Sequence, residues 1–203
     1  FHLDVPHFDG GFVGVDVFFV ISGYLITGNI FRDIDAGRFS FGEFYGKRVR
    51  RILPAMFVTL IATFLAGALL MSPGPFADLG ASAIAAAFSV SNFFFWTSSG
   101  YFDTEAVTKP LLHTWSLGVE EQFYLFWPAL LFLTPAKWRI AVLAAGSAVS
   151  LMAAQIWLKI DATAAFFLLP FRVVEFGIGG ILAATAVNPR FKDGLAIVGL
   201  VMI

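Results

Sequence analysis

Three polar side chains recur every four residues in an otherwise apolar part of the chain: Ser116, Glu120 and Tyr124. Residues four apart share one face of a helix, so this spacing predicts a polar stripe inside an apolar bundle. Such a stripe suits the positioning of a hydroxyl-bearing substrate. A simpler interpretation stays open, because Ser116 followed by Glu120 also fits the start of a capped helix.

A basic cluster runs from Lys47 to Arg51 and carries three guanidinium groups, on Arg48, Arg50 and Arg51. The planar fork of donors on arginine matches the oxygens of phosphate in pairs. We therefore expect these arginines to hold a nucleotide-type donor molecule. The alternative is a plain cytoplasmic anchor that touches anionic lipid head groups.

Ionisable residues also lie within apolar stretches, where a charge costs at least ~2.5–3.5 kcal/mol at the bilayer centre. Arg172 and Glu175 are three residues apart and are expected to pair on one helix face. The pair either belongs to a functional site or forms an internal salt bridge that holds helices together. Asp16 either caps the start of a helix or orients a nearby histidine or arginine.

The three histidines, His2, His7 and His113, are isolated along the chain and taken alone are typical of loop or interface residues. Cysteine is absent, which excludes a thiolate nucleophile and a disulfide. The chain has no HExxH motif, no metal-ligand spacing, no GxSxG motif and no phosphate-binding loop. We therefore expect no metal and no bound cofactor.

The composition excludes a soluble domain. Of the 203 residues, 59% are hydrophobic and 13% are charged, whereas soluble domains carry about 25% charged residues. The mean hydropathy is +0.83, and the 25 Phe and 19 Gly are typical of lipid-embedded helices. The net charge of −1 gives no indication of nucleic-acid binding. These values predict an all-α, polytopic membrane bundle that forms a single domain over residues 1–203.

The apolar runs predict where the helices cross the membrane, since about 20 residues span the hydrocarbon core. The expected spans are Phe12–Phe31, Ile52–Met71, Leu79–Trp96, Ile140–Leu158 and Ala165–Val187, with a shorter run at Ser116–Thr134 and one that begins near Leu195. Lysine and arginine gather between Arg32 and Arg51 and again at Lys137 and Arg139, which predicts that both regions are cytoplasmic. Three spans between them would place them on opposite sides. One of the three is therefore not a full crossing, and we expect it to be Ser116–Thr134.

Four stretches resemble the acyltransferase family 3 membrane proteins, which O-acylate bacterial cell-surface carbohydrates. They follow the order of the family and comprise Gly10–Ile26, Phe44–Pro54, Pro110–Tyr124 and, more weakly, Pro170–Gly177. The resemblance implies a domain of roughly ten helices in the bacterial inner membrane, of which this chain is expected to be a fragment that lacks both ends. The forms of the first and third stretches resemble the subgroup fused to a C-terminal extracytoplasmic SGNH domain.

The resemblance also implies a mechanism. His2 is similar to an essential histidine of the family, and the arginine that accompanies that histidine would precede residue 1. Acyl-coenzyme A, acetyl-coenzyme A by preference, is the expected donor, and the basic cluster would bind its phosphates. His2 would act as general base on a sugar hydroxyl or carry the acyl group briefly itself. The acceptor class is a surface carbohydrate such as lipopolysaccharide O-antigen or an exopolysaccharide. A small-molecule transporter or exporter and a structural membrane module are the competing classes.

Overall fold

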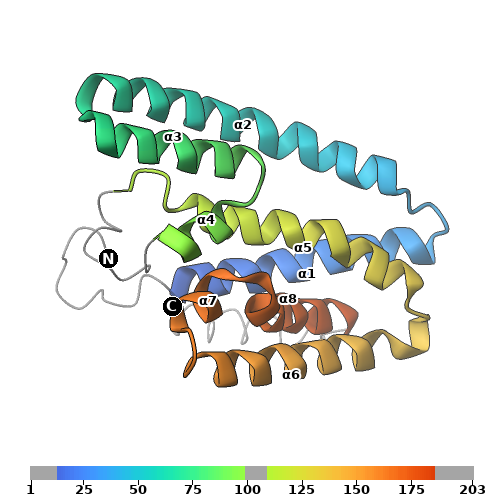
Figure 1. Ribbon diagram of the computed structural model, residues 1–203. Helices are drawn as coiled ribbons and strands as arrows, with labels where there is room; N and C mark the ends of the chain where they lie inside the picture. Colours follow the sequence, from blue (N-terminus) through green and yellow to red (C-terminus); the bar gives the residue numbers. More distant parts are fainter. Residues whose placement is uncertain (1–12, 99–108, 186–203) are drawn as a thin grey trace.

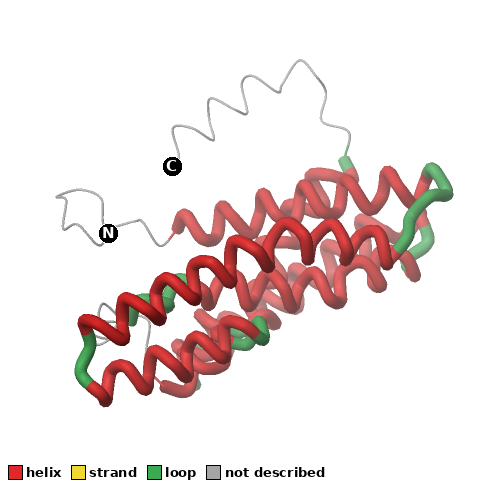
Figure 2. Tube along the Cα trace, turned by 90° about the horizontal axis from the view of Figure 1, so that it is seen from above, coloured by secondary structure: helices red, strands yellow, loops and turns green. Residues whose placement is uncertain are grey.

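The computed structural model describes residues 13–98 and 109–185, and every regular element in these two ranges is helical. Figure 1 shows how the elements are arranged, and Figure 2 shows that the long helices run along roughly one common axis. The elements are α1 (Val13–Asp35), α2 (Phe41–Leu70), α3 (Pro73–Ala87), α4 (Ser91–Ser98), α5 (Thr114–Leu133), the short 3-10 helix η2 (Ala136–Trp138), α6 (Arg139–Trp157), α7 (Ala162–Phe167) and α8 (Leu169–Ala184).

The distribution of side chains is that of a membrane bundle. Leu69 and Leu70 are 85% and 83% exposed, whereas Thr27 and Asn92 are completely buried. Apolar groups thus face outward and polar groups find partners inside, as a lipid environment requires. Within the described ranges, four helical stretches are long and apolar enough to cross a membrane: 13–35, 41–70, 136–157 and 162–184. The prediction of an all-α, multi-pass membrane bundle is confirmed.

The centre of the bundle is the close pair of α1 and α8, which run side by side (Figure 1). A Cβ on Gly23 would overlap the backbone of Phe176, and a Cβ on Gly179 would overlap the backbone of Val20. Glycine at these two positions therefore lets the helix backbones touch, as small residues do in membrane bundles. The ring of Phe176 stacks on Phe123 of α5, with ring centroids 3.9 Å apart, which ties the pair to the third helix of the core.

The expected span Leu79–Trp96 is wrong, because this stretch forms two helices, α3 and α4. Ser89 adopts a left-handed backbone (φ 58°). The N–H groups of Ser89 and Val90 bond to the carbonyls of Ala86 and Ala85, the pattern that closes a helix C-terminus. Gln122 of α5 then donates to the Ser89 carbonyl at 3.0 Å. The apolar sequence hides this break, since a serine takes the position at which glycine is usual.

The break at Ser89 explains how the two basic regions come to lie at the same end of the bundle. Residues at the start of α3 (Pro75), the end of α4 (Ser98) and the approach to α5 (Lys109) line one cavity. The α3–α4 hairpin therefore returns to the end of the bundle at which it began (Figure 1). One of the three spans is indeed not a full crossing. The expected one, Ser116–Thr134, forms a continuous helix of 20 residues, α5, about 30 Å long at the helical rise. Because α5 is not among the four described stretches apolar enough to cross a membrane, the expectation for Ser116–Thr134 stays a prediction.

The basic residues of the described ranges gather mainly at one end of the bundle, on the right of Figure 1. This basic end carries Arg32, Arg38, Lys47, Arg48, Lys137 and Arg139. The guanidinium of Arg139 binds the Asp35 carboxylate through two hydrogen bonds of 2.8 and 3.1 Å, so the start of α6 is fixed to the end of α1. The positive-inside rule predicts that the basic end is the cytoplasmic one.

Two further boundaries differ from the sequence expectation. α2 begins at Phe41, eleven residues before the expected Ile52, so the basic cluster lies on a helix and not in a loop. The stretch expected from Ala165 is divided at Leu168 into α7 and α8, where Pro170 starts the new helix. The run near Leu195 lies outside the described residues.

Candidate active site

Two of the three stripe residues meet a side chain of α1 in the centre of the bundle. The Ser22 hydroxyl donates to Oε1 of Glu120 at 2.6 Å and lies 2.7 Å from the Tyr124 hydroxyl. The Tyr124 hydroxyl also donates to Glu120 Oε1. All three side chains are buried. We call these residues the hydroxyl–carboxylate cluster.

Ser22 was not among the residues predicted for the site. It lies near the middle of α1, in an apolar run beside Gly23. A small residue next to a lone serine in such a run is a weak signal of close helix approach. The pairing itself joins residues 98 positions apart and depends on how α1 packs against α5.

The third stripe residue, Ser116, lies apart from the cluster. Its hydroxyl donates to the carbonyl of His113 at 3.1 Å, a bond within the first turn of α5. Both residues line a cavity of about 400 Å³ between α2 and α5, together with Arg51. The stripe is therefore divided between two places along α5.

Arg48 connects the cluster to the basic end. Its guanidinium lies over the ring of Tyr124, 4.3 Å from the centroid, and 5.5 Å from the centroid of Phe44. Tyr45, three residues earlier, donates to the Leu125 carbonyl at 2.8 Å and so holds this face of α2 against α5. Within the described ranges the Arg48 guanidinium has no ion pair.

A cavity of about 330 Å³ opens beside Arg48 at the basic end, between the end of α1 and the start of α2. Some other charges in its lining are neutralised: Lys47 pairs with Glu43 at 2.6 Å, and Asp33 pairs with Arg38 at 2.9 Å. Arg32 lines the same cavity and, among the described residues, has only a hydrogen bond of 3.4 Å to the Asn29 side chain. Arg48 thus offers a guanidinium without an ion pair to any described side chain between this cavity and the Tyr124 ring, with the Glu121 carboxylate as an electrostatic neighbour. The arrangement suits an anion that enters from the basic end. We call it the basic-end cavity.

The three predicted phosphate ligands do not share one cavity. Arg48 lines the basic-end cavity, whereas Arg51 lines the cavity with His113. Arg50 turns back along its own helix, where its Nε donates to the Gly46 carbonyl at 3.1 Å. Residues 48 and 51 are three apart, yet α2 presents them to different neighbours.

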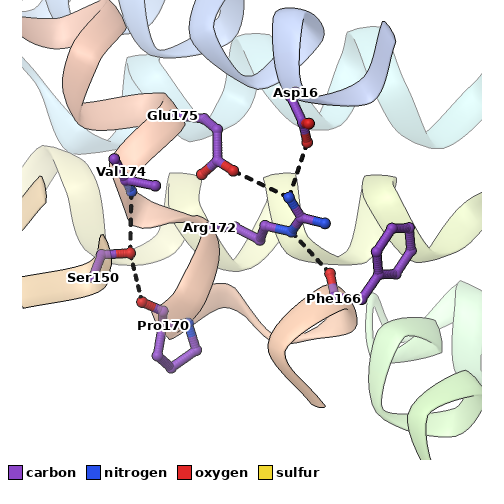
Figure 3. A network of polar contacts seen from close by, with 7 residues as sticks. All are labelled: Asp16, Ser150, Phe166, Pro170, Arg172, Val174 and Glu175. Atoms are coloured by element: carbon purple, nitrogen blue, oxygen red, sulfur yellow. Dashed lines mark hydrogen bonds and ion pairs between the residues drawn. The ribbon is translucent and has the colours of Figure 1, made fainter. Parts of the chain in front are cut away.

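The expected pairing of Arg172 with Glu175 is confirmed, and Asp16 joins it (Figure 3). Nη1 of Arg172 donates to Asp16 Oδ1 at 2.9 Å and to Glu175 Oε1 at 3.1 Å. Its Nε donates to the Phe166 carbonyl at 2.9 Å, and the guanidinium lies 4.9 Å from the centre of the Phe166 ring. Of the two roles open to Asp16, orienting an arginine is the one observed. We call Asp16, Arg172 and Glu175 the ion-pair network.

The second polar contact in Figure 3 joins α6 to α8. Ser150 donates to the Pro170 carbonyl at 2.8 Å and accepts the Val174 N–H at 3.2 Å. The serine hydroxyl thereby bridges two backbone groups in the first turn of α8. This bond and the ion-pair network fix opposite sides of the same turn.

His2 and His7 lie outside the described residues. His113 is exposed and directly precedes α5. In the two described ranges, no group of three or more histidine, cysteine, aspartate or glutamate side chains could hold a metal ion.

Comparisons with known proteins place the chain among acyltransferases. The family described as Acyltransferase domain matches residues 3–203. The chain is 39% identical over 140 residues to a protein of Listeria monocytogenes named "Peptidoglycan O-acetyltransferase OatA", covering 68% of this chain and 22% of that protein. It is 38% identical over 132 residues to a Staphylococcus aureus protein named "O-acetyltransferase OatA", covering 64% of this chain and 22% of that protein.

A third relative, named only as an uncharacterized protein of Haemophilus influenzae, is 43% identical over 127 residues, which cover 62% of this chain and 51% of that protein. The chain thus spans between about a fifth and a half of the length of these relatives. No solved structure gives a significant match. Because the family match extends over nearly all 203 residues, the chain belongs to this family of membrane acyltransferase domains.

Proposed function

We propose that this chain is the membrane part of an O-acyltransferase that moves an acyl group, acetyl by preference, from cytoplasmic acyl-coenzyme A to a hydroxyl of a cell-surface carbohydrate in the bacterial inner membrane. Peptidoglycan is a candidate acceptor through the printed name of the Listeria relative. Lipopolysaccharide O-antigen and exopolysaccharide are the other acceptors of this class.

One observation carries the proposal beyond family membership. The basic-end cavity leads to Arg48, and the Arg48 guanidinium lies over the ring of Tyr124, whose hydroxyl belongs to the buried hydroxyl–carboxylate cluster. A donor whose phosphates sit at the cytoplasmic end can therefore direct its acyl end toward buried polar groups without leaving the bundle. Arg48 lies between the cavity and the cluster and is the first candidate to bind a phosphate. Arg32 lines the same cavity without an ion pair to another described residue, and Arg51 lies on the neighbouring cavity.

The reaction exchanges one ester for another. The sugar hydroxyl attacks the thioester carbon, a carbon–oxygen bond forms, and the carbon–sulfur bond to coenzyme A breaks. His2 takes the proton from the hydroxyl and passes it to the departing thiolate, so the products are the sugar ester and free coenzyme A. Glu120, held by two hydroxyl groups, supplies a fixed negative charge that orients the reacting groups.

The experiment uses the full-length protein in inside-out membrane vesicles that contain its native glycan, with labelled acetyl-coenzyme A added to the exposed cytoplasmic face. Label is expected in the carbohydrate fraction, and His2→Ala is expected to abolish its incorporation. His7→Ala is the matched control, because no role is proposed for His7. Unchanged transfer in His2→Ala would overturn the role of the histidine, and absence of transfer from the wild-type protein would overturn the proposed function.

A further inference from the structure

One acidic residue is isolated in the hairpin that does not cross the bundle. Between Ile52 and Ser98 the chain has a single charged residue, Asp78. It lies in the second turn of α3 and has no hydrogen bond or ion pair to any other described residue. An ionisable residue in an otherwise uncharged membrane segment is a candidate for a functional site.

Asp78 lines a cavity of about 380 Å³ between the two arms of the hairpin, at the end of the bundle opposite the basic end. Ser82 lies one turn further along α3, and Phe94 and Ser98 face them from α4. Both pairs are four residues apart, so each helix presents one continuous face to the cavity. Ser82 donates its own proton to the Leu79 carbonyl, so its oxygen is free to accept.

We propose that this cavity, the hairpin cavity, binds the carbohydrate acceptor from the extracytoplasmic side. The inference rests on the proposed function and adds where its second substrate binds. A carboxylate can accept hydrogen bonds from two neighbouring sugar hydroxyls, the serine oxygens can take part in further ones, and the Phe94 ring offers a face for the C–H groups of a pyranose. The volume lies at the lower end of the range for small-ligand sites, roughly 300–1,000 Å³, and suits one sugar unit of a longer glycan.

The position also separates the two substrates. The basic-end cavity is lined by several cationic side chains and suits a phosphorylated donor. The hairpin cavity has one acidic and one basic side chain in its lining, Asp78 and Lys109, and so offers no excess of positive charge to a phosphate. Donor and acceptor would then approach the buried cluster from opposite ends of the bundle. This arrangement places each substrate on its own side of the membrane, because acyl-coenzyme A is made in the cytoplasm and the acceptor glycan is displayed outside.

A labelling experiment tests the site without relying on activity. The sequence has no cysteine, so Ser98→Cys in the full-length protein introduces a thiol into this part of the chain at the edge of the cavity. A membrane-impermeant maleimide is applied to intact cells, with and without a chitooligosaccharide, a short polymer of N-acetylglucosamine. We expect labelling from outside, and a several-fold slower rate with the oligosaccharide present.

Two matched variants serve as controls. Thr97→Cys places the thiol on the neighbouring residue, which does not line the cavity, and should be labelled equally with and without the sugar. Phe41→Cys places it at the basic end and should react only after the cells are opened. Labelling of Ser98→Cys that the oligosaccharide leaves unchanged, or that occurs only in opened cells, would overturn the proposal.

Kinetics distinguish a failure of the site from a failure of the proposed function. Asp78→Asn should raise KM for the oligosaccharide at least fivefold and leave KM for acetyl-coenzyme A unchanged, whereas Asp161→Asn, a carboxamide change outside the cavity, should alter neither. An unchanged KM for the acceptor in Asp78→Asn would overturn the site while leaving the transfer reaction intact. Absence of transfer in the wild-type protein, with sugar protection of Ser98→Cys preserved, would overturn the proposed reaction and retain the binding site.

Discussion

The two polar networks described above each take one residue from α1, but they differ in where the positive charge lies. In the ion-pair network, Arg172 lies between two carboxylates, and its Nε also has a backbone partner. In the hydroxyl–carboxylate cluster, Glu120 is held only by neutral hydroxyl groups, and the nearest described cation, Arg48, lies on the ring of Tyr124 next to a cavity. In the first arrangement the cation is paired with both carboxylates, although Glu175 Oε2 is buried without a hydrogen-bond partner among the described residues. In the second arrangement the cation is available to a ligand.

This difference suggests that the ion-pair network stabilises the fold, whereas the hydroxyl–carboxylate cluster takes part in the reaction. A cation paired with two carboxylates has its charge compensated, and its removal leaves those carboxylates without a cation. A carboxylate fixed by hydroxyl groups keeps its charge for a reacting group, and an unpaired guanidinium beside a cavity can bind a phosphate. We therefore expect substitutions in the cluster to lower activity and substitutions in the network to lower stability.

The largest effect is expected for Glu120→Gln. The substitution keeps the size of the side chain but removes its negative charge, and a positioned group of this kind typically contributes about 10²–10⁴-fold to a rate. We expect kcat for acyl transfer to fall at least about 100-fold, with the melting temperature in detergent little changed. Asp161→Asn, the same change of a carboxylate to a carboxamide outside the cluster, is the control and should retain most activity. An equal loss in both variants would contradict a special role for the cluster.

Arg172→Met should act mainly on stability. The change leaves Asp16 and Glu175 without their cation, and removal of one partner from a buried ion pair costs about 3–5 kcal/mol. Because the Asp16 side chain is 38% exposed, we expect the lower end, about 3 kcal/mol. Reversible unfolding of the detergent-solubilised protein measures it, and Glu175→Gln in the same chain should restore part of the loss. A fully stable but inactive Arg172→Met protein would place the network among the reacting groups.

The smallest effect concerns a carboxylate held by neutral donors at the surface. Asp161 accepts the Ala164 N–H at 2.8 Å and the Trp96 indole N–H at 2.9 Å. These two donors, the backbone group first, hold the pKa of Asp161 below its ordinary value of 3.8. Loss of this helix cap in Asp161→Ala should cost about 1 kcal/mol.

The contribution of Asp161 depends on pH in a defined direction. A lowered pKa stabilises the folded state above the unfolded value, and this stability is lost as the pH falls through the folded value. The difference in melting temperature between the wild-type and Asp161→Ala proteins should therefore be constant near neutral pH and should shrink below pH 3.8. A difference that grows in acid would contradict the assignment.

The sequence predicts local features of the site better than distant ones. The pairing of Arg172 with Glu175 follows from their spacing on one helix, and the meeting of Glu120 with Tyr124 follows from a spacing of four. Ser22 could not be placed in the same way, since its contact requires the packing of α1 on α5. The divergence of Arg48 from Arg51 depends equally on which neighbour each side of α2 contacts.

The fold shows the same limit. Hydropathy predicts that the chain is a bundle of membrane helices, and the basic residues predict which ends lie together. The interruption at Ser89 is not predictable from hydropathy, because a left-handed serine between apolar residues leaves the average unchanged. The positions of lysine and arginine already require one crossing fewer than hydropathy predicts. That the stretch from Leu79 to Trp96 turns back is known only from the geometry of the α3–α4 hairpin.

The central claim is that the free guanidinium of Arg48 binds the donor and brings it to the cluster, and a paired substitution tests it most directly. KM for acetyl-coenzyme A is measured in inside-out vesicles for Arg48→Ala and for Arg50→Ala, whose guanidinium is bound to its own helix. A charged hydrogen bond contributes about 1.5–3 kcal/mol, so Arg48→Ala should raise KM at least about tenfold, whereas Arg50→Ala should change it by less than about threefold. Equal values of KM in the two variants would contradict the account.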